Sequence, residues 1–262
     1  MRDLLVSVLA IFLPIVGGYQ AAVAANADSA PLLTSEASSP TTTVTTTSTT
    51  TSTIHGACLS IASGWNLVGT GEGGTLDVAM ALGDPAKVEA VWRWVHDKKS
   101  WAFYAPALAA QGGSVLADYA ANNGFDVLGT IGPGEGFWVN ATEQLSVGWS
   151  TGGEIHATSF QDGKPGALSP GWHLISIAGM ITPSEFNADI GASPAPAGVV
   201  PNNIISLWAW DTLLGKWYYY APTLEAQGGT ALTDYVTGKG YLDFAANNKV
   251  LHSGIGFWVN KP

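Results

Sequence analysis

Two short motifs in this sequence match patterns that bind cofactors or catalyse reactions in other proteins. The first is a glycine-rich loop. Residues Gly69 to Gly74 match the Gly-x-Gly-x-x-Gly pattern, whose backbone can approach a dinucleotide phosphate closely. That use requires a parallel βαβ unit and an acid about twenty residues further on. Glu89 comes too early for that acid, so we interpret the segment as a flexible loop and predict no cofactor.

The second motif surrounds Ser150. Gly148-Trp149-Ser150-Thr151-Gly152 fits the nucleophile elbow of serine hydrolases, which needs a strand before the serine and a helix after it. Gly152 and Gly153 disfavour a following helix, and no strand–helix alternation runs through the chain. We therefore expect Ser150 to end a strand that begins near Leu145, and hydrolase activity at Ser150 is kept only as a distant alternative.

The remaining titratable side chains give no catalytic or metal-binding pattern. Asp118 and Asp234 occupy matching places near the start of two expected helices, where the helix dipole alone favours a carboxylate. Glu135 has Ile255 at its matching place, which argues against a shared role. The five histidines (His55, His96, His156, His173, His252) lack the spacing of a helical zinc site. We predict no metal site, with a calcium site built from Asp and backbone oxygens as an open alternative.

The elements that must position these residues come in two copies. Tryptophan-bearing motifs recur in the same order, and ten of the 11 tryptophans fall into matching pairs, which leaves only Trp149 unmatched. The pairs are Gly64–Val68 with Gly171–Ile175, Val91–Trp94 with Leu207–Trp210, Trp101–Pro106 with Trp217–Pro222, Ala110–Gly113 with Ala226–Gly229, and Gly136–Asn140 with Gly256–Asn260. Such recurrence indicates two homologous modules formed by internal duplication.

Each copy is predicted to be mainly β, with short helices. Tryptophans alternate with other residues along 91–95 and 101–104, which is the period of a half-buried strand. We therefore expect hairpins over 91–104 and 207–220, and short glycine-bounded strands at the first and last motifs. Ser114 and Thr230 are expected to cap helices that end at Gly124 and Gly240. The Pro- and Ala-rich segment 192–201, present in the second copy alone, should be irregular.

The order of these motifs resembles a known repeat. Gly-Trp-Asn-Leu, Trp-x-Trp, Trp-x-x-Tyr and Gly-x-Gly-Phe-Trp-Val, over 58–140 and again 167–260, is similar to a tryptophan-rich repeat module of exported and surface proteins of bacteria and archaea. The resemblance implies secretion and a modular architecture, and no established activity or active site. One departure is His173, where the motif usually has the Asn found at Asn66.

The region before the modules has the composition of an export signal followed by a tether. Arg2, an apolar run and small residues near Ala25 predict a secretory signal peptide over 1–25, and the run is short of the roughly 20 residues that span a bilayer. Residues 26–53 are rich in Ser and Thr, which predicts a disordered linker or an O-glycosylated stalk. Module boundaries are then expected at 54–141 and 167–262, joined by a connecting strand or linker over 142–166. No other segment is apolar enough to span a membrane.

Composition restricts the partners. The formal net charge of −10 and the lack of a basic cluster argue against nucleic acid and anionic membranes. Cys58 is the single cysteine, so no internal disulfide can form. We expect its side chain to be buried beside Leu59 and Ile61, and a bond between two chains is the alternative.

The aromatic content suggests binding to polysaccharide or to another surface protein. Trp and Tyr rings can stack on sugars, yet residues kept in both copies are those that the fold needs, so we expect the paired tryptophans to form the core of each module. Ligand contact is then expected at Trp149 and Tyr218, with Tyr104 and Tyr220 next. The chain is predicted to be a secreted or surface non-catalytic interaction module, with carbohydrate binding as the alternative.

Overall fold

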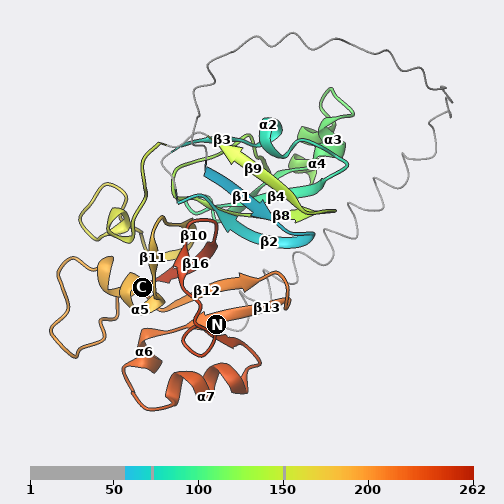
Figure 1. Ribbon diagram of the computed structural model, residues 1–262. Coiled ribbons are helices and arrows are strands. Elements are labelled where there is room, and N and C mark those ends of the chain that lie inside the picture. The colour runs from blue at the N-terminus through green and yellow to red at the C-terminus, as the bar shows by residue number, and fades with distance from the viewer. Residues whose placement is uncertain (1–56, 72–73, 150–151) are drawn as a thin grey trace, which may run out of the picture. The chain divides into compact units, whose positions relative to one another are not determined.

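Two five-stranded sheets dominate the residues that the computed structural model describes, which are 57–71, 74–149 and 152–262 (Figure 1). The predicted β-rich class with short helices is therefore confirmed. We call the part around the first sheet (57–149) module 1 and the part around the second sheet (152–262) module 2. Residues 55–262 cluster as one compact unit.

The two sheets have the same strand order. In space, the first sheet runs β2 (Gly64–Gly69), β8 (Gly136–Ala141), β4 (Val88–Val95), β5 (Ser100–Tyr104) and β6 (Asp126–Val127). The second runs β10 (Gly171–Ser176), β16 (Gly256–Lys261), β12 (Ser206–Asp211), β13 (Lys216–Tyr220) and β14 (Leu242–Asp243). In each sheet the last strand pairs in parallel and the other strands pair antiparallel.

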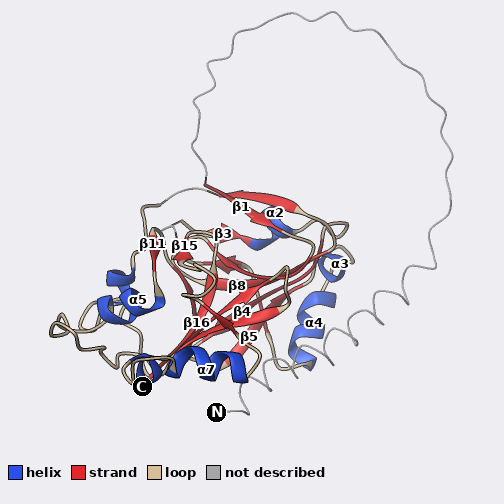
Figure 2. Ribbon diagram, turned by 60° about the horizontal axis from the view of Figure 1, so that its bottom comes forward, coloured by secondary structure: helices blue, strands red, loops and turns tan. Residues whose placement is uncertain are grey.

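The smaller elements lie around these sheets (Figure 2). Three two-stranded pairs join β1 (Ala57–Ile61) to β9 (Leu145–Trp149), β3 (Leu76–Asp77) to β7 (Thr130–Ile131), and β11 (Met180–Ile181) to β15 (Leu251–His252). The helices are α2 (Val78–Leu82), α3 (Pro106–Ala109), α4 (Val115–Asn122), α5 (Pro183–Asp189), α6 (Pro222–Glu225) and α7 (Ala231–Gly238), with the 3₁₀ helix η2 (Ala157–Phe160). As expected, 192–201 is irregular.

Both predicted hairpins are present and share one register. Trp94 faces Trp101 across β4 and β5, and Trp210 faces Trp217 across β12 and β13. The helices after each Gly-Gly pair are also present, but their predicted caps differ in detail. The hydroxyl of Ser114 donates to the Asp118 carboxylate at 2.6 Å, and makes no bond to the helix backbone. Thr230 and Asp234 repeat this contact at 2.8 Å, which accounts for the two matching aspartates without catalysis.

Each module has its own hydrophobic core on one face of its sheet. In module 1 that face carries Val91, Phe137 and Val139, and the β1–β9 pair closes over it. In module 2 the matching Leu207, Phe257 and Val259 pack with residues of α5. Tryptophan contributes to neither cluster.

The recurring tryptophans occupy the opposite face of each sheet, and this corrects our prediction. We expected the indole rings to form the core of each module, but they lie on the other face of the sheet. Ring contacts across the two modules join Trp94 and Trp101 to Trp258, and Trp138 to Trp210 and Trp217. Of the ten paired rings, Trp92, Trp101, Trp138, Trp208 and Trp258 are buried, and the others are half-buried. Because strand residues alternate between faces, Val91 and Trp92 must point in opposite directions. The sequence shows that alternation without showing which face is covered by the other module.

Reciprocal contacts join the two tryptophan faces. The indole Nε1–H of Trp94 donates to the Trp172 carbonyl at 3.0 Å, and that of Trp210 donates to the Trp65 carbonyl at 3.0 Å. Aromatic rings of the two modules are also in contact. The ring centroids of Trp258 in module 2 and Trp94 in module 1 lie 5.9 Å apart, edge to face. Edge-to-face aromatic pairs add about 0.5–1.5 kcal/mol to the energy of area burial. We call this surface the tryptophan joint.

Motif glycines allow the backbones to meet at the end of the joint. A Cβ on Gly256 would lie 2.4 Å from the Val68 carbonyl oxygen, and one on Gly136 would lie 2.7 Å from the Ile175 carbonyl oxygen. Val68 and Ile175 hold matching positions in the two copies, so this contact is also reciprocal. The glycine before Phe-Trp-Val is thus required by close approach of the other module.

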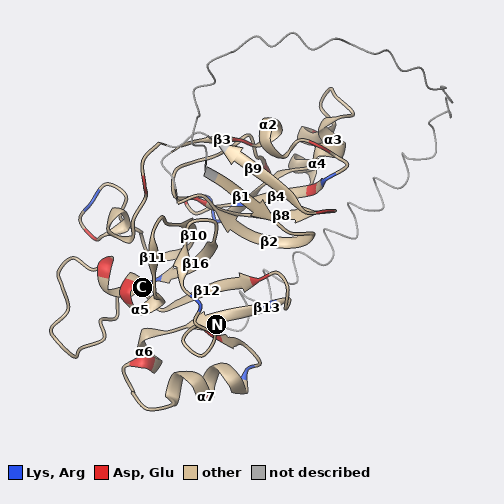
Figure 3. Cartoon of the chain, in the orientation of Figure 1, with Lys and Arg blue, Asp and Glu red and all other residues tan. Residues whose placement is uncertain are grey.

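The exposed side of strand β1 carries Cys58, which we expected to be buried. Leu59 and Ile61 point into the core of module 1, and strand alternation places Cys58 on the outside. Figure 3 shows Asp, Glu, Lys and Arg mainly in loops and near the ends of helices and strands, so most sheet positions are uncharged. Within the described residues, no helix has the length and hydropathy needed to cross a membrane.

The close approach at Gly256 gives a test of the joint. Gly256→Ala should destabilise the protein by about 1–3 kcal/mol, because the added methyl overpacks against the Val68 backbone. Gly238→Ala is the control, since a Cβ there meets nothing within 4 Å and lies in a helix that alanine favours. Urea unfolding of both variants measures the difference, and equal stability of the two would contradict the described joint.

Candidate functional site

The tyrosines expected to contact a ligand are buried in the module cores. Tyr104, Tyr218 and Tyr220 are only 7%, 5% and 3% exposed, so as they lie none of them presents a ring face to a ligand. Burial raises the pKa of Tyr104 and Tyr220, and Tyr220 also donates to Glu225 at 2.5 Å. The backbone of Trp149 in β9 pairs with that of Ala57 in β1, and the side chain of Trp149 lies outside the described part of the structure. Ligand binding at Trp149 stays a prediction.

A groove opens beside the tryptophan joint, between residues of module 1 and residues of module 2. In module 1 the pairing of β4 with β8 ends at Trp92 and Trp138, while in module 2 it continues to Ala209 and Phe257. Beyond Trp138, Glu135 instead bridges to Ile175 of module 2. The resulting hollow has a volume of ≈ 480 Å³, and we call it the interface groove. It is lined by residues 93–97, 133–135, 160, 165–169 and 173–175.

An ion pair stands in the interface groove. Nη1 of Arg93 lies 2.7 Å from both carboxylate oxygens of Glu135, and the two side chains are 24% and 34% exposed. The Gly132 amide also donates to Glu135 at 2.6 Å, which fixes the carboxylate. The Nε of Arg93 is buried and has no hydrogen-bond partner among the described residues. A ligand oxygen or a water that reached this atom would supply the missing acceptor.

Two histidines from different modules form the other polar part of the groove. His96 follows β4 of module 1, His173 lies in β10 of module 2, and their rings stack with centroids 3.8 Å apart at 14°. Both rings contact Ser169, at 2.7 Å in each case. Burial is the main cause that lowers the pKa of His173, and the neighbouring His96 lowers it further.

All four polar side chains (Arg93, Glu135, His96 and His173) differ from the residues at the matching positions of the other module. Arg93 and Glu135 correspond to Ala209 and Ile255, which are buried and apolar. The His96–His173 stack corresponds to a contact between Thr212 and Asn66, whose side-chain oxygens lie 3.4 Å apart. The fold therefore accepts an uncharged set at this place, and the charged and titratable set is specific to one side.

Sequence reasoning missed these residues. Glu135 was set aside because the second copy has Ile255 there, and the histidines because they are scattered along the chain. A usable signal was nevertheless present, because polar residues stand in one copy where the other copy has apolar or smaller ones. Positions that the fold leaves free to differ are the ones available for binding.

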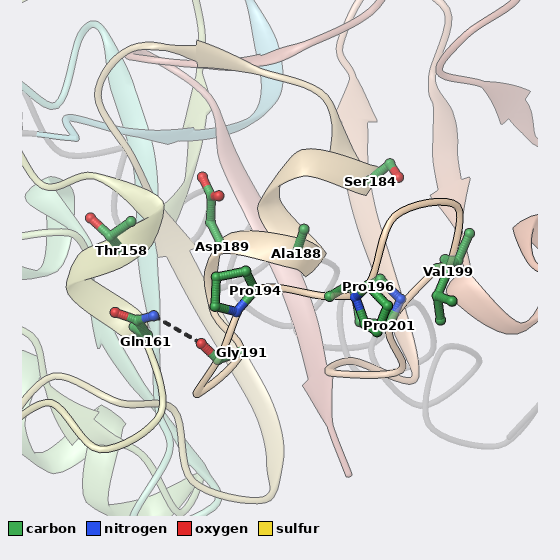
Figure 4. A pocket seen from close by; sticks show the side chains of 12 residues that line it. Thr158, Gln161, Ser184, Ala188, Asp189, Gly191, Pro194, Pro196, Val199 and Pro201 are labelled. Carbon is green, nitrogen blue, oxygen red and sulfur yellow. Dashed lines mark hydrogen bonds between the residues drawn. The ribbon is translucent and has the colours of Figure 1, made fainter.

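A second hollow lies beneath the irregular segment that only module 2 contains. Figure 4 shows Pro194, Pro196 and Pro201 around an opening that helix α5 and Thr158 also border. The Gln161 amide donates to the Gly191 carbonyl at 2.9 Å across its edge. Its lining is mostly proline, alanine and valine without an ion pair, so the interface groove is the better candidate site.

The structure gives no further support to a catalytic or cofactor-binding role for the glycine-rich loop or for the motif around Ser150. Strand β2 is antiparallel to its neighbour β8, so the glycine loop after it does not belong to a parallel βαβ unit. Strand β9 begins at Leu145 as predicted, and Ser150, the expected end of that strand, lies outside the described residues. Among the described residues, no three His, Cys, Asp or Glu side chains gather as a metal site would need.

Comparison with known proteins does not identify the chain. No family model, curated protein or solved structure gives a significant match. The resemblance to a tryptophan-rich surface repeat stays a prediction from the motifs.

The ion pair can be tested with the residues that module 2 uses. Arg93→Ala should cost about 1–3 kcal/mol of stability, because Glu135 loses its charged partner in a partly buried place. Arg93→Ala combined with Glu135→Ile should recover part of that loss, since it installs the pair found in module 2. Urea unfolding of the single and double variants measures the coupling, and additive effects within about 0.5 kcal/mol would contradict it.

Proposed function

We propose that this protein is a non-catalytic interaction protein of the cell exterior. In this proposal residues 1–25 direct export, the Ser/Thr-rich segment 26–53 acts as a tether, and the two modules form one binding head. We also propose that the modules arose by internal duplication, which would account for their shared strand order and reciprocal joint contacts.

The observation that carries the proposal is the use of the recurring tryptophans. Their indole N–H groups and ring edges engage the other module, as Trp94 does with Trp172 and Trp258. Aromatic residues used this way hold the two modules in a fixed relative position and are not available to contact a substrate. A rigid head with a polar groove at its joint suits binding, since little order must be gained on association.

The export part of the proposal predicts a location. Whole protein produced with its residues 1–25 should reach the cell exterior and lose that segment, whereas protein lacking 1–25 should stay inside. Mass spectrometry of the mature N-terminus and protease treatment of intact cells measure both outcomes. Full-length protein that is found inside and uncleaved would contradict the proposal.

Carbohydrate binding is the second candidate, and the Arg93–Glu135 pair favours it. The pair presents a donor and an acceptor side by side beside Trp94 and Phe160, and planar polar groups next to aromatic residues suit the hydroxyls and apolar face of a sugar. Binding of the whole chain to a panel of polysaccharides should weaken at least tenfold in the Arg93→Ala/Glu135→Ile variant.

The same panel separates the sites. Trp149→Ala and Tyr218→Ala test the positions predicted from sequence, and loss of binding only in Trp149→Ala would move the site to β9. Unchanged binding in Arg93→Ala/Glu135→Ile, in Trp149→Ala and in Tyr218→Ala would contradict both the interface groove and the positions predicted from sequence. Labelling of Ser150 by a serine-hydrolase probe, abolished in Ser150→Ala, would overturn the non-catalytic proposal.

A further inference from the structure

The stacked histidines join the two modules through a hydrogen-bond network that neutral rings satisfy. The Trp172 carbonyl can only accept, so Nδ1 of His96, at 3.0 Å from it, carries a hydrogen. Nε2 of His96 then accepts from the Ser169 hydroxyl in the neutral ring. Nε2 of His173 carries a hydrogen and donates to the Ser169 carbonyl. Every one of these bonds is complete without a positive charge.

Few groups around the stack could compensate a charge on both rings. From the end of β4, Asp97 is the one carboxylate that favours a protonated His173. Arg93 and Glu135 line the same groove and neutralise each other. The loop at 165–169 packs against the stack from the other side and carries no charged residue. Two imidazolium rings 3.8 Å apart would therefore face one carboxylate between them.

The opposite side of the joint has no such dependence. There Trp210 donates to the Trp65 carbonyl as Trp94 donates to the Trp172 carbonyl, but the neighbouring side chains are Thr212 and Asn66. Neither side chain titrates. The molecule thus contains two versions of one contact, and they differ in whether a proton can disturb it.

We propose that the tryptophan joint is a one-sided pH-sensitive switch: acid opens it between His96 and His173, beside the interface groove, while the Asn66–Thr212 side stays closed. The opened state can place a proton on each ring, and the stacked state accommodates one at most. This inference stands apart from the ligand of the groove and from the cell location, so it can fail or hold independently of the proposed function.

The direction follows from proton linkage. A free imidazole has a pKa of about 6.5, and burial and the neighbouring ring lower the pKa of His173 in the closed joint. The closed joint is therefore fully favoured above about pH 6.5. Below that value, its ratio to the open joint falls by about tenfold per pH unit for each extra proton taken up, until the pKa of the stacked ring is reached.

Hydrogen exchange of two indole N–H groups in the whole protein tests this switch. NMR should show the Trp94 indole N–H exchanging at least tenfold faster at pH 5 than at pH 7, after correction for the intrinsic rate. The Trp210 indole N–H is the matched control, because it makes the same bond on the other side, and it should change less than twofold. Equal acceleration of both groups, or of neither, overturns the proposal.

A variant with the residues of the other side identifies the cause. His96→Thr combined with His173→Asn should remove the acid acceleration at Trp94 and leave Trp210 unchanged. Acceleration that persists in the folded variant would assign the effect to other groups and overturn the proposal. The wild-type imidazole titration gives a readout that needs no variant: the pKa of His173 should lie below that of a free imidazole, and a His173 pKa at or above about 6.5 would be the contrary result.

Discussion

Each sheet of this protein has two apolar faces. Its own module covers one of them and only part of the other, where Phe125 contacts Trp92 and Tyr119 contacts Phe103. The small strands and helices of a module close over Val91 and Val139, or over their counterparts Leu207 and Val259. The other face carries large indole rings, and an exposed surface of that kind would be costly in water. The two modules therefore cover each other, and this requirement explains the glycines at the crossing and the indole bonds to carbonyl groups.

Mutual covering also explains why residues that recur are poor guides to function here. The two modules carry the same residue at a position that serves the reciprocal joint, as with Trp94 and Trp210 or Gly136 and Gly256. Positions beside the joint are free to differ once the rings are in place. The charged pair and the histidine stack occupy such positions, so the candidate site and the titratable contact both lie on the side of the joint that departs from its counterpart.

Local features of the fold could be predicted from sequence because they depend on nearby residues. Alternation around Trp92 and Trp94 predicted the hairpin, and the glycines predicted the strand ends. The choice of face could not be predicted, since both faces are apolar and alternation alone does not say which neighbour covers them. Tyr218 was expected at a ligand because only one copy has an aromatic residue there, and Tyr104 and Tyr220 because they lie on the strand face opposite Trp101 and Trp217. That face is the core.

The candidate site depended on contacts between distant parts of the chain. His96 meets His173 across the two modules, and Arg93 meets Glu135 from 42 residues away, beside the place where β4 and β8 cease to pair. The spacing of residues along the chain does not predict such contacts. What the sequence did contain was the difference between copies at these positions, and that difference has physical meaning only once the joint is known.

Coupling between Trp94 and Trp258 tests the tryptophan joint most directly, because these rings belong to different modules and meet edge to face at 5.9 Å. A double-mutant cycle with Trp94→Ala and Trp258→Ala, measured by denaturant unfolding of the intact chain, gives their interaction free energy. The account predicts a favourable coupling of about 0.5–1.5 kcal/mol. Additive losses, with a coupling indistinguishable from zero, would show that the two tryptophan faces do not cover each other.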